Sequence, residues 1–179
     1  MRQEGIDSKN NIIKAFIKLL KVKPFDKVSI KEICDNANVS RQTFYAHYAS
    51  KDDIFKKFYI EMFNELCLKK ITDVKYFYSD GFIWSVIDFF EEWNELFIVL
   101  NQWDLLTYLT KESTNAINDI IREICDIPYI TDHPSYFLSF VYEPLTSICL
   151  KWVLSGKKET KNELLKIIVY YRNTMNGKF

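Results

Sequence analysis

The sequence has few of the residues that interrupt helices. Its 179 residues include only 4 Gly and 4 Pro, and β-branched runs with period-two alternation are absent. Glycine and proline mark most turns, and period-two alternation marks half-buried strands, so their scarcity favours helices throughout. The sequence therefore predicts an all-α protein.

Metal-binding and catalytic patterns are also lacking. The 4 cysteines lie far apart and without a C-x-x-C, at Cys34, Cys67, Cys125 and Cys149, and the chain has only 2 histidines. Zinc sites need closely spaced ligands, so no metal is expected. Because each cysteine lies in an apolar helical pattern, we expect its thiol to be buried and reduced. The alternative is that a cysteine senses redox conditions. No nucleophile motif or glycine-rich phosphate loop occurs, so neither an enzyme nor a bound cofactor is expected.

A secretion signal and a membrane-spanning run are likewise not apparent. The first residues are polar, and we see no apolar run near the roughly 18 residues that a transmembrane helix needs. The sequence predicts a cytoplasmic protein with no membrane partner.

Hydrophobic side chains are abundant and charge is unevenly spread. Hydrophobic residues make up 48% of the chain and aromatic residues 16%, which is ample for a substantial core. Residues 1–51 hold ten Lys and Arg against five Asp and Glu, whereas residues 52–179 hold fourteen against nineteen. A basic end followed by an acidic body is typical of a protein whose first part faces DNA.

Residues 29–38 have the pattern of a short amphipathic helix that ends in a turn. Ser29 and Glu32 have the spacing of a capping box, which opens a helix. Asn38 stands where a tight turn needs a left-handed residue. Apolar residues recur at helical spacing between them, at Ile30, Ile33, Cys34 and Ala37.

Residues 40–51 predict a second helix whose exposed side is suited to DNA. Ser40 would cap this helix, Phe44 and Tyr48 would form its buried side, and Ser50 would cap the helix that follows. Donors, acceptors and one flat ring crowd the opposite side, at Arg41, Gln42, Thr43, Tyr45 and His47. A helix of this kind fits the major groove, and Lys51 would favour a phosphate.

Residues 29–51 together resemble the DNA-binding domain of the TetR family of transcriptional regulators. Cys34, Asn38 and Tyr48 replace the family's usual small Ala, turn Gly and Phe. Each replacement keeps the property that its position needs, because Cys is a small apolar residue, Asn accepts the turn geometry and Tyr keeps an aromatic ring. The resemblance covers about residues 8–60 and lies in the joint spacing of its matches, at Ser29, Ile33, Ala37, Val39, Ser40, Phe44, Tyr45, His47 and Lys51.

The resemblance and the residue pattern together give a set of DNA-binding residues. We expect Arg41 and Gln42 to reach base edges, and His47 and Lys51 to contact phosphates. The full set is Ser29, Ser40, Arg41, Gln42, Thr43, Tyr45, His47 and Lys51. We expect residues 1–52 to form the DNA-binding domain and residues 53–179 an all-helical domain for effector binding and dimerisation.

The second domain is rich in aromatic residues and continues in helices. We expect residues 1–7 to be frayed before a helix from Ser8, a loop at residues 126–134, and helices over residues 135–155 and 160–173. Another amphipathic pattern runs from about Leu105 to Ile124. Most of the aromatics are expected in the core, and some could line an apolar ligand pocket, at Trp84, Phe89, Trp93, Trp103 and Tyr108.

The last two helices carry more apolar surface than one internal face needs. Such an excess predicts a homodimer in which these helices pack on their symmetry mates. The interface residues that we expect are Phe137, Val141, Ile148, Trp152, Leu164, Ile168 and Tyr171.

The sequence thus predicts a sequence-specific regulator that binds double-stranded DNA. The resemblance implies a ligand-responsive repressor that binds a palindromic, inverted-repeat operator as a dimer and responds to a small-molecule effector. The alternative is a relative that regulates through contact with another protein instead of DNA.

Overall fold

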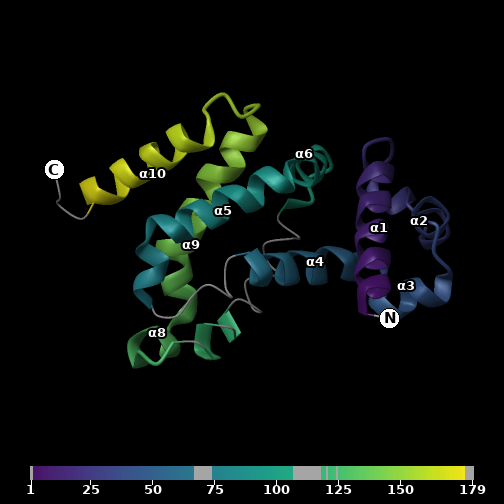
Figure 1. Ribbon diagram of the computed structural model, residues 1–179, viewed down its shortest axis with the longest axis horizontal. Coiled ribbons are helices and arrows are strands. Elements are labelled where there is room, and N and C mark those ends of the chain that lie inside the picture. The colour runs from purple at the N-terminus through teal and green to yellow at the C-terminus, as the bar shows by residue number, and fades with distance from the viewer. Residues whose placement is uncertain (1, 67–73, 107–117, 120, 124, 176–179) are drawn as a thin grey trace.

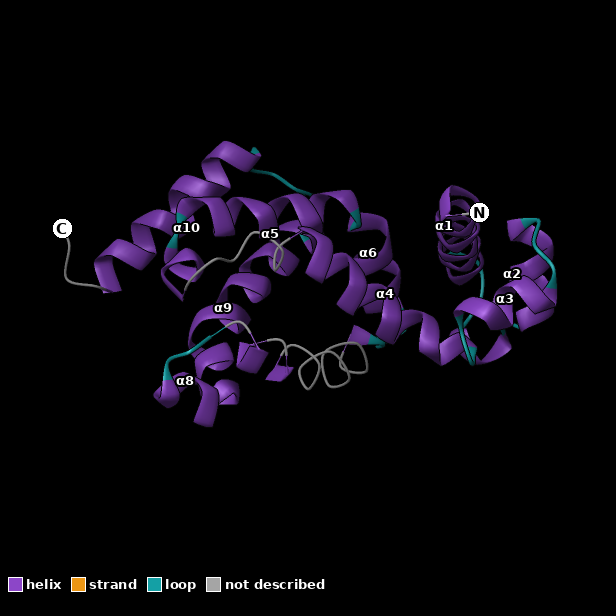
Figure 2. Ribbon diagram, turned by 60° about the horizontal axis from the view of Figure 1, so that its bottom comes forward, coloured by secondary structure: helices purple, strands orange, loops and turns teal. Residues whose placement is uncertain are grey.

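The chain forms helices in every part that the structure describes. The structure, a computed structural model, describes residues 2–66, 74–106, 118–119, 121–123 and 125–175, and no strand occurs among them. This confirms the all-α class (Figures 1 and 2). The longer helices are α1 (Arg2–Leu20), α2 (Ile30–Ala37), α3 (Arg41–His47), α4 (Lys51–Leu66), α5 (Asp80–Glu92), α6 (Asn94–Gln102), α9 (Pro134–Leu154) and α10 (Lys161–Met175). The short elements are the 3₁₀ helices η1 (Phe25–Lys27) and η3 (Val74–Tyr78) and the helix α8 (Pro128–Asp132).

The first three helices and the start of α4 form a small head with an aromatic core. The ring of Phe16 on α1 lies 4.9 Å from that of Phe55 on α4, and Phe25 of η1 lies 5.3 Å from Phe55. Because these rings are shared, the first turns of α4 belong to the core of the head. The division that we expected after residue 52 therefore falls inside one continuous helix.

The remaining helices form a body in which α5 is central. α5 contacts α9, α10, α6 and α4, and its buried rings Phe89 and Phe90 pack with Phe97 of α6 at 5.7 and 4.3 Å between centroids. Lys161, the first residue of α10, pairs with Asp88 and Glu91 of α5 at 3.0 and 2.8 Å. Figure 1 shows α4 as the connection that leads from this body to the head.

Local hydrogen bonds fix the end of α9 and the start of α10. Gly156 has φ +87°, and the amides of Gly156 and Lys157 bond to the carbonyls of Val153 and Trp152 at 3.1 and 2.9 Å, a Schellman motif that closes α9. A capping box opens α10, because the Thr160 amide donates to Glu163 at 2.8 Å and the Glu163 amide donates to the Thr160 hydroxyl.

Three expectations about the chain need correction. α1 begins at Arg2 and not at Ser8, and the stretch 126–134 is not all loop because it contains α8 and the first residue of α9. α9 is also long and apolar enough to cross a membrane, with a mean hydropathy of 1.3, so an apolar run of that kind does exist. One such helix is weak evidence of a membrane span, and one side of α9 packs on α5 and α6.

Three of the cysteines lie in the described part of the chain, and each is buried and free, as expected. They are Cys34, Cys125 and Cys149. Burial raises the pKa of the Cys149 thiol to about 12, so this group stays protonated. Cys67 and most of the pattern over residues 105–124 lie outside the described residues.

The buried ring of Tyr48 gives a prediction about stability. Its side chain is 0% exposed, and its hydroxyl has no hydrogen-bond partner in the structure. An unsatisfied buried hydroxyl costs about 1–3 kcal/mol. Tyr48→Phe should therefore raise the free energy of unfolding, measured by urea denaturation, by about 1 kcal/mol. A loss of stability in this variant would show that the hydroxyl has a partner.

Candidate nucleic-acid interface

α2 is fixed at both ends by local hydrogen bonds. The Ser29 hydroxyl accepts from the Glu32 amide at 3.3 Å while the Glu32 carboxylate accepts from the Ser29 amide at 3.0 Å, so the expected capping box is present. Asn38 ends the helix with φ 55° and ψ 46°, in the left-handed conformation that the turn requires. The chain then reverses into α3, which confirms the helix-turn-helix pattern.

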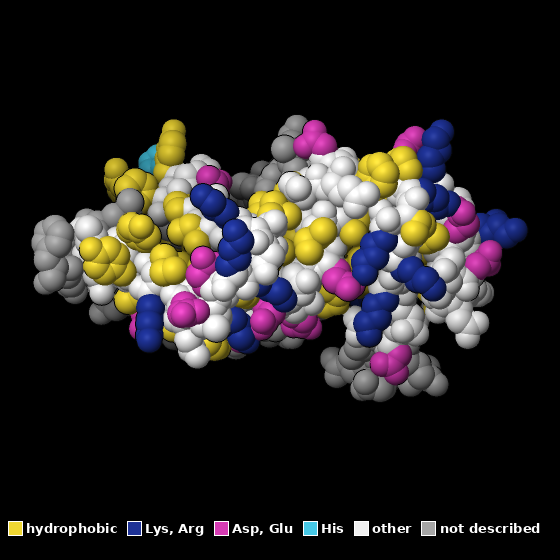
Figure 3. Space-filling view, turned by 90° about the horizontal axis from the view of Figure 1, so that it is seen from above, with side chains coloured by type: hydrophobic (Ala, Val, Ile, Leu, Met, Phe, Trp, Pro, Cys, Tyr) yellow, Lys and Arg dark blue, Asp and Glu magenta, His cyan; other side chains and the backbone are white. Residues whose placement is uncertain are grey.

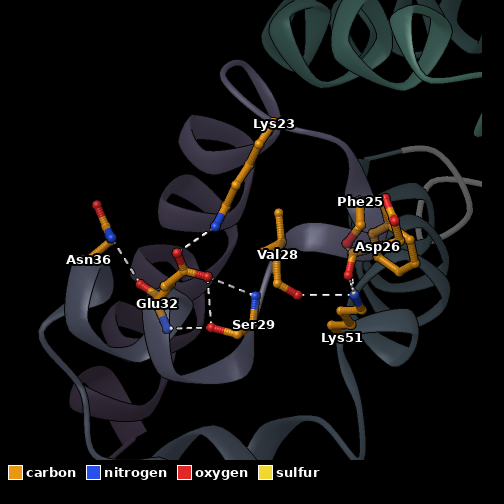
Figure 4. A network of polar contacts seen from close by, with 8 residues as sticks. All are labelled: Lys23, Phe25, Asp26, Val28, Ser29, Glu32, Asn36 and Lys51. Carbon is orange, nitrogen blue, oxygen red and sulfur yellow. Dashed lines mark hydrogen bonds and ion pairs between the residues drawn. The ribbon is translucent and has the colours of Figure 1, made fainter.

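A polar network ties the start of α2 to the end of α1 (Figure 4). Lys23 makes an ion pair with the same Glu32 carboxylate that closes the capping box. The hydrogen bond from Lys23, with those from Ser29, lowers the pKa of Glu32 to about 2. Glu32 therefore stays charged above acidic pH and holds the loop between α1 and α2 against the start of α2.

α3 is short and is held in place by its buried aromatic side. The Ser40 hydroxyl accepts from the Thr43 amide at 2.9 Å and caps the helix. Phe44 and Tyr48 are both 0% exposed, and their rings lie 5.8 Å apart. Since this side is buried in the head, the opposite side of α3 faces outward.

The outward side of α3 carries the side chains expected to read bases. Arg41 and Gln42 are exposed, and Tyr45 is 56% exposed with its ring edge-on to that of Phe44 at 5.5 Å. Ala46 is exposed too, one turn after Gln42. Ala46 gave no signal in the sequence because its methyl group is not polar, although its spacing of four residues from Gln42 places it on the same face.

The serine and threonine hydroxyls in the expected set take part in the hydrogen bonds that cap α2 and α3. Ser29 bonds to Glu32, and the hydroxyls of Ser40 and Thr43 lie 2.8 Å apart. A hydroxyl that already serves as a cap can still accept or donate one further bond. Their first contribution is to shape the starts of α2 and α3.

His47 is held at the end of α3 by groups from α1 and α4. Its Nε2 lies 2.9 Å from the Ser8 hydroxyl, and the Lys57 ammonium donates to the His47 carbonyl at 3.0 Å. Burial lowers the pKa of His47, and the positive charges of Lys9 and Lys57 lower it further. In the free protein the imidazole is therefore neutral near pH 7 and acts as a hydrogen-bonding group.

Lys51 is placed differently from the expectation. Its ammonium donates to the carbonyls of Phe25, Val28 and Asp26 at 2.7, 3.0 and 3.3 Å and lies 4.4 Å above the centre of the Phe25 ring (Figure 4). All three of its protons thus have acceptors inside the head. The geometry fits a cap on the η1 turn, and the phosphate contact that the sequence suggested stays a prediction.

The start of α4 is capped as expected, and it carries acidic side chains. The Asp53 amide donates to the Ser50 hydroxyl at 3.2 Å, and the Asp53 carboxylate accepts from the Ala49 amide at 2.9 Å. Asp52 and Asp53 stand in its first turn, so this helix start already has negative charge beside its free amides.

The residues that we expect to line a ligand pocket contact different neighbours. Phe89 is fully buried among core rings, and the Lys161 ammonium lies 5.5 Å from the centre of the Trp84 ring. Trp93 packs on Phe58 of α4, and the Trp103 indole donates to a carbonyl of α1. Tyr108 lies outside the described residues.

The residues expected at a dimer interface differ in their exposure within a single chain. Trp152, Leu164 and Ile168 are 4%, 4% and 7% exposed within a single chain, so these three belong to its own core and cannot supply an outer surface. Phe137, Val141 and Ile148 are partly buried, and Tyr171 is exposed. The exposed apolar residues of the same helices are Tyr136, Phe140, Leu154, Ile167, Tyr170 and Tyr171.

Two comparisons with known proteins agree with this geometry. Residues 12–58 match the family model described as bacterial regulatory proteins, tetR family. The whole chain is similar in fold to the crystal structure of a TetR transcriptional regulator from Streptococcus agalactiae 2603V, with a TM-score of 0.56 and 23% identity over 97% of this chain and 96% of that chain. No curated protein sequence matches the chain.

A helix-turn-helix head with a polar recognition side, attached to a helical body, defines a DNA-binding regulator. The head, over residues 12–58, matches the tetR family model, and the chain as a whole shares its fold with a TetR regulator.

The position of Lys51 gives a prediction that separates a structural role from a phosphate contact. Lys51→Ala should lower the free energy of unfolding by about 1–3 kcal/mol, because three carbonyls lose a charged donor. The dependence of DNA affinity on salt should stay unchanged. Lys27→Ala, at an exposed residue of the same turn, is the control and should not affect unfolding. A phosphate contact would instead reduce the salt slope by about 0.9 without loss of stability.

Proposed function

We propose that this protein is a TetR-family regulator that binds an inverted-repeat operator as a homodimer, with one α3 in the major groove of each half-site. The observation that carries this proposal is the outward side of α3, where Arg41, Gln42 and Tyr45 stand exposed over the buried Phe44. Arginine and glutamine make the two-pronged hydrogen bonds that distinguish guanine and adenine in the major groove. A head that acted only through contact with another protein would not need these exposed side chains on α3.

The dimer is supported by α9 and α10, whose outer sides are apolar. α9 has a mean hydropathy of 1.3, but only 33% of its apolar window is buried within the chain. Phe140 is 87% exposed on α9, and Tyr170 is 66% exposed on α10. Figure 3 shows hydrophobic side chains gathered at the end of the molecule that α8, α9 and α10 form.

Spacing along the two helices fits a four-helix bundle between two chains. Tyr136, Phe140, Ser147 and Leu154 recur along one exposed side of α9, and Ile167, Tyr170 and Tyr171 lie on the exposed side of α10. Ser147 puts a small side chain near the middle of its row, where packed helices approach most closely. We therefore propose these seven residues as the centre of the dimer interface, with Phe137, Val141 and Ile148 at its edge.

The regulatory part of the proposal is a ligand-responsive repressor in the cytoplasm. A small apolar molecule bound in the body would change the spacing of the two heads and weaken operator binding. This coupling requires that the molecule binds the two head spacings with different affinity. Regulation through another protein is the alternative, and it is favoured only if variants of the α3 face leave DNA binding unchanged.

Base reading by α3 is tested with a duplex that contains the intergenic DNA beside the protein's own gene. Gln42→Ala should weaken binding to the operator in this duplex by about 1–3 kcal/mol, because one pair of base contacts in each half-site is lost. Binding to a scrambled duplex should not change. Titrations on both duplexes at three salt concentrations measure the two affinities.

Gln102→Ala makes the same chemical change on the exposed surface of the body and is the matched control. It should bind both duplexes like the unmutated protein. Equal operator affinity for Gln42→Ala, Arg41→Ala and the unmutated protein would contradict the assignment of α3 and favour the protein-contact alternative.

The dimer is tested by placing a charge on its proposed face. Phe140→Glu should give a folded monomer near 21.4 kDa in sedimentation at micromolar concentration, because a carboxylate would be buried without a partner. Val22→Glu changes an apolar residue of the head that is 77% exposed and should remain dimeric. A dimeric Phe140→Glu protein would exclude this face.

Ile168→Glu separates the interface from the core. Because Ile168 is buried within its own chain, this change should unfold the body and should not yield a folded monomer. Circular dichroism and thermal melting distinguish these outcomes.

A further inference from the structure

Ala46 presents a methyl group on the exposed face of α3, at the end of the molecule opposite to α10 (Figure 1). Residues four apart lie in a row along a helix, so this face carries two neighbouring rows. One row is Arg41 with Tyr45, and the other is Gln42 with Ala46, and all four side chains are exposed. Arginine, glutamine and tyrosine can form hydrogen bonds through their side chains, and alanine cannot.

The residues on both sides of Ala46 are fixed by contacts within the head. The Tyr45 ring packs edge-on against the buried ring of the preceding residue, with 5.5 Å between centroids. The His47 imidazole lies 2.9 Å from the Ser8 hydroxyl of α1, and the His47 carbonyl accepts from Lys57 of α4 at 3.0 Å. The second turn of α3 is therefore tied to α1 and α4, and the Ala46 methyl group has a defined position on the face.

A methyl group can favour a base only through apolar contact. Among the four standard bases, thymine presents an apolar group in the major groove, the C5-methyl, beside the polar groups that every base pair carries there. A cytosine amino group or a guanine oxygen placed against Ala46 would lose water without gaining a hydrogen bond. The chemistry of this position therefore favours thymine.

The distance along α3 sets where this thymine lies. Gln42 and Ala46 are four residues apart, which corresponds to about 6 Å along a helix. Successive base pairs are stacked about 3.4 Å apart. If α3 follows the groove, the base pair that faces Ala46 is therefore about two pairs from the one that Gln42 reads.

We propose that Ala46 is a specificity-determining residue whose methyl group contacts the C5-methyl of a thymine in each half-site. This inference rests on the proposed operator binding, and it names a base that the operator contains. The hydrogen bonds of Arg41 and Gln42 select polar base edges, and Ala46 adds an apolar contact at a separate base pair. Each half-site is thus read by two kinds of interaction.

The test uses uracil in place of thymine, which removes the C5-methyl and keeps the base pair. Each thymine of the half-site is replaced in turn, at the symmetric positions of both half-sites in the operator duplex. Replacement of the thymine that faces Ala46 should weaken binding of the unmutated protein by about tenfold to twentyfold, because burial of a methyl group is worth about fourfold in each half-site. Titration of each duplex measures the affinity.

Ala46→Gly removes the methyl group from the protein side of the contact. In this variant uracil at the same position should weaken binding by less than about twofold, because the thymine methyl no longer has a partner. Each variant is compared on two duplexes, so a general loss of affinity cancels. Ala46→Asn, which keeps a side chain but makes it polar, should lose the preference as well. Ala49→Gly changes an exposed alanine just beyond α3 and should keep the full loss.

The outcomes separate this contact from the proposed function. Equal affinity of the unmutated protein for every uracil duplex would overturn the contact, and so would a loss that persists in Ala46→Gly. A loss that persists in Ala46→Gly and disappears in Tyr45→Ala would assign the thymine to the tyrosine ring instead. An unmutated protein that does not distinguish the operator from a scrambled duplex would contradict the proposed function itself, and this contact with it.

Discussion

The burial of Phe44 is the contact on which the DNA-binding surface depends. α3 has only seven residues, and a helix of that length is not stable alone in water. Its direction is set because Phe44 is completely buried in the head and is joined by the ring of Tyr48. Everything exposed on α3, from Arg41 to Ala46, takes its position from that buried side.

The head in turn depends on contacts that lie outside the helix-turn-helix itself. Phe16, Phe25 and Phe55 come from three separate elements and share one aromatic cluster, and Lys51 closes the η1 turn by donating to its carbonyls. The first turns of α4 are therefore part of the DNA-binding unit, while the rest of α4 leads to the body. A helix shared in this way is a direct mechanical connection between the two parts.

Local signals in the sequence were sufficient to predict the helix-turn-helix. The capping box at Ser29, the left-handed Asn38 and the buried Phe44 all follow from residues within a few positions of one another. The contacts of Lys51 had no signal in the sequence because its acceptors lie 23 to 26 residues earlier in the chain, and no spacing rule connects them. The outward position of Arg41, Gln42 and Tyr45 followed from the clear apolar side of α3, and their contacts with bases stay a prediction.

The outer faces of α9 and α10 were harder to predict for a different reason. These helices are apolar on more than one side, so periodicity shows that two faces exist and does not show which one faces the core. Trp152, Leu164 and Ile168 face inward, and Phe140 and Tyr170 face outward. Only the packing against α5 distinguishes them. The contact of Trp103 with Leu20 spans 83 residues and had no signal in the sequence.

The central claim is that two copies of α3 read two half-sites in one DNA duplex. Selection of bound sequences from a pool of randomised duplexes, at physiological salt, tests it without knowledge of the natural operator. The account predicts enrichment of an inverted repeat whose half-site centres lie a whole number of helical turns apart, about 10 base pairs or a multiple of that. A pool with no enriched sequence, or with a single unrepeated site, would contradict it.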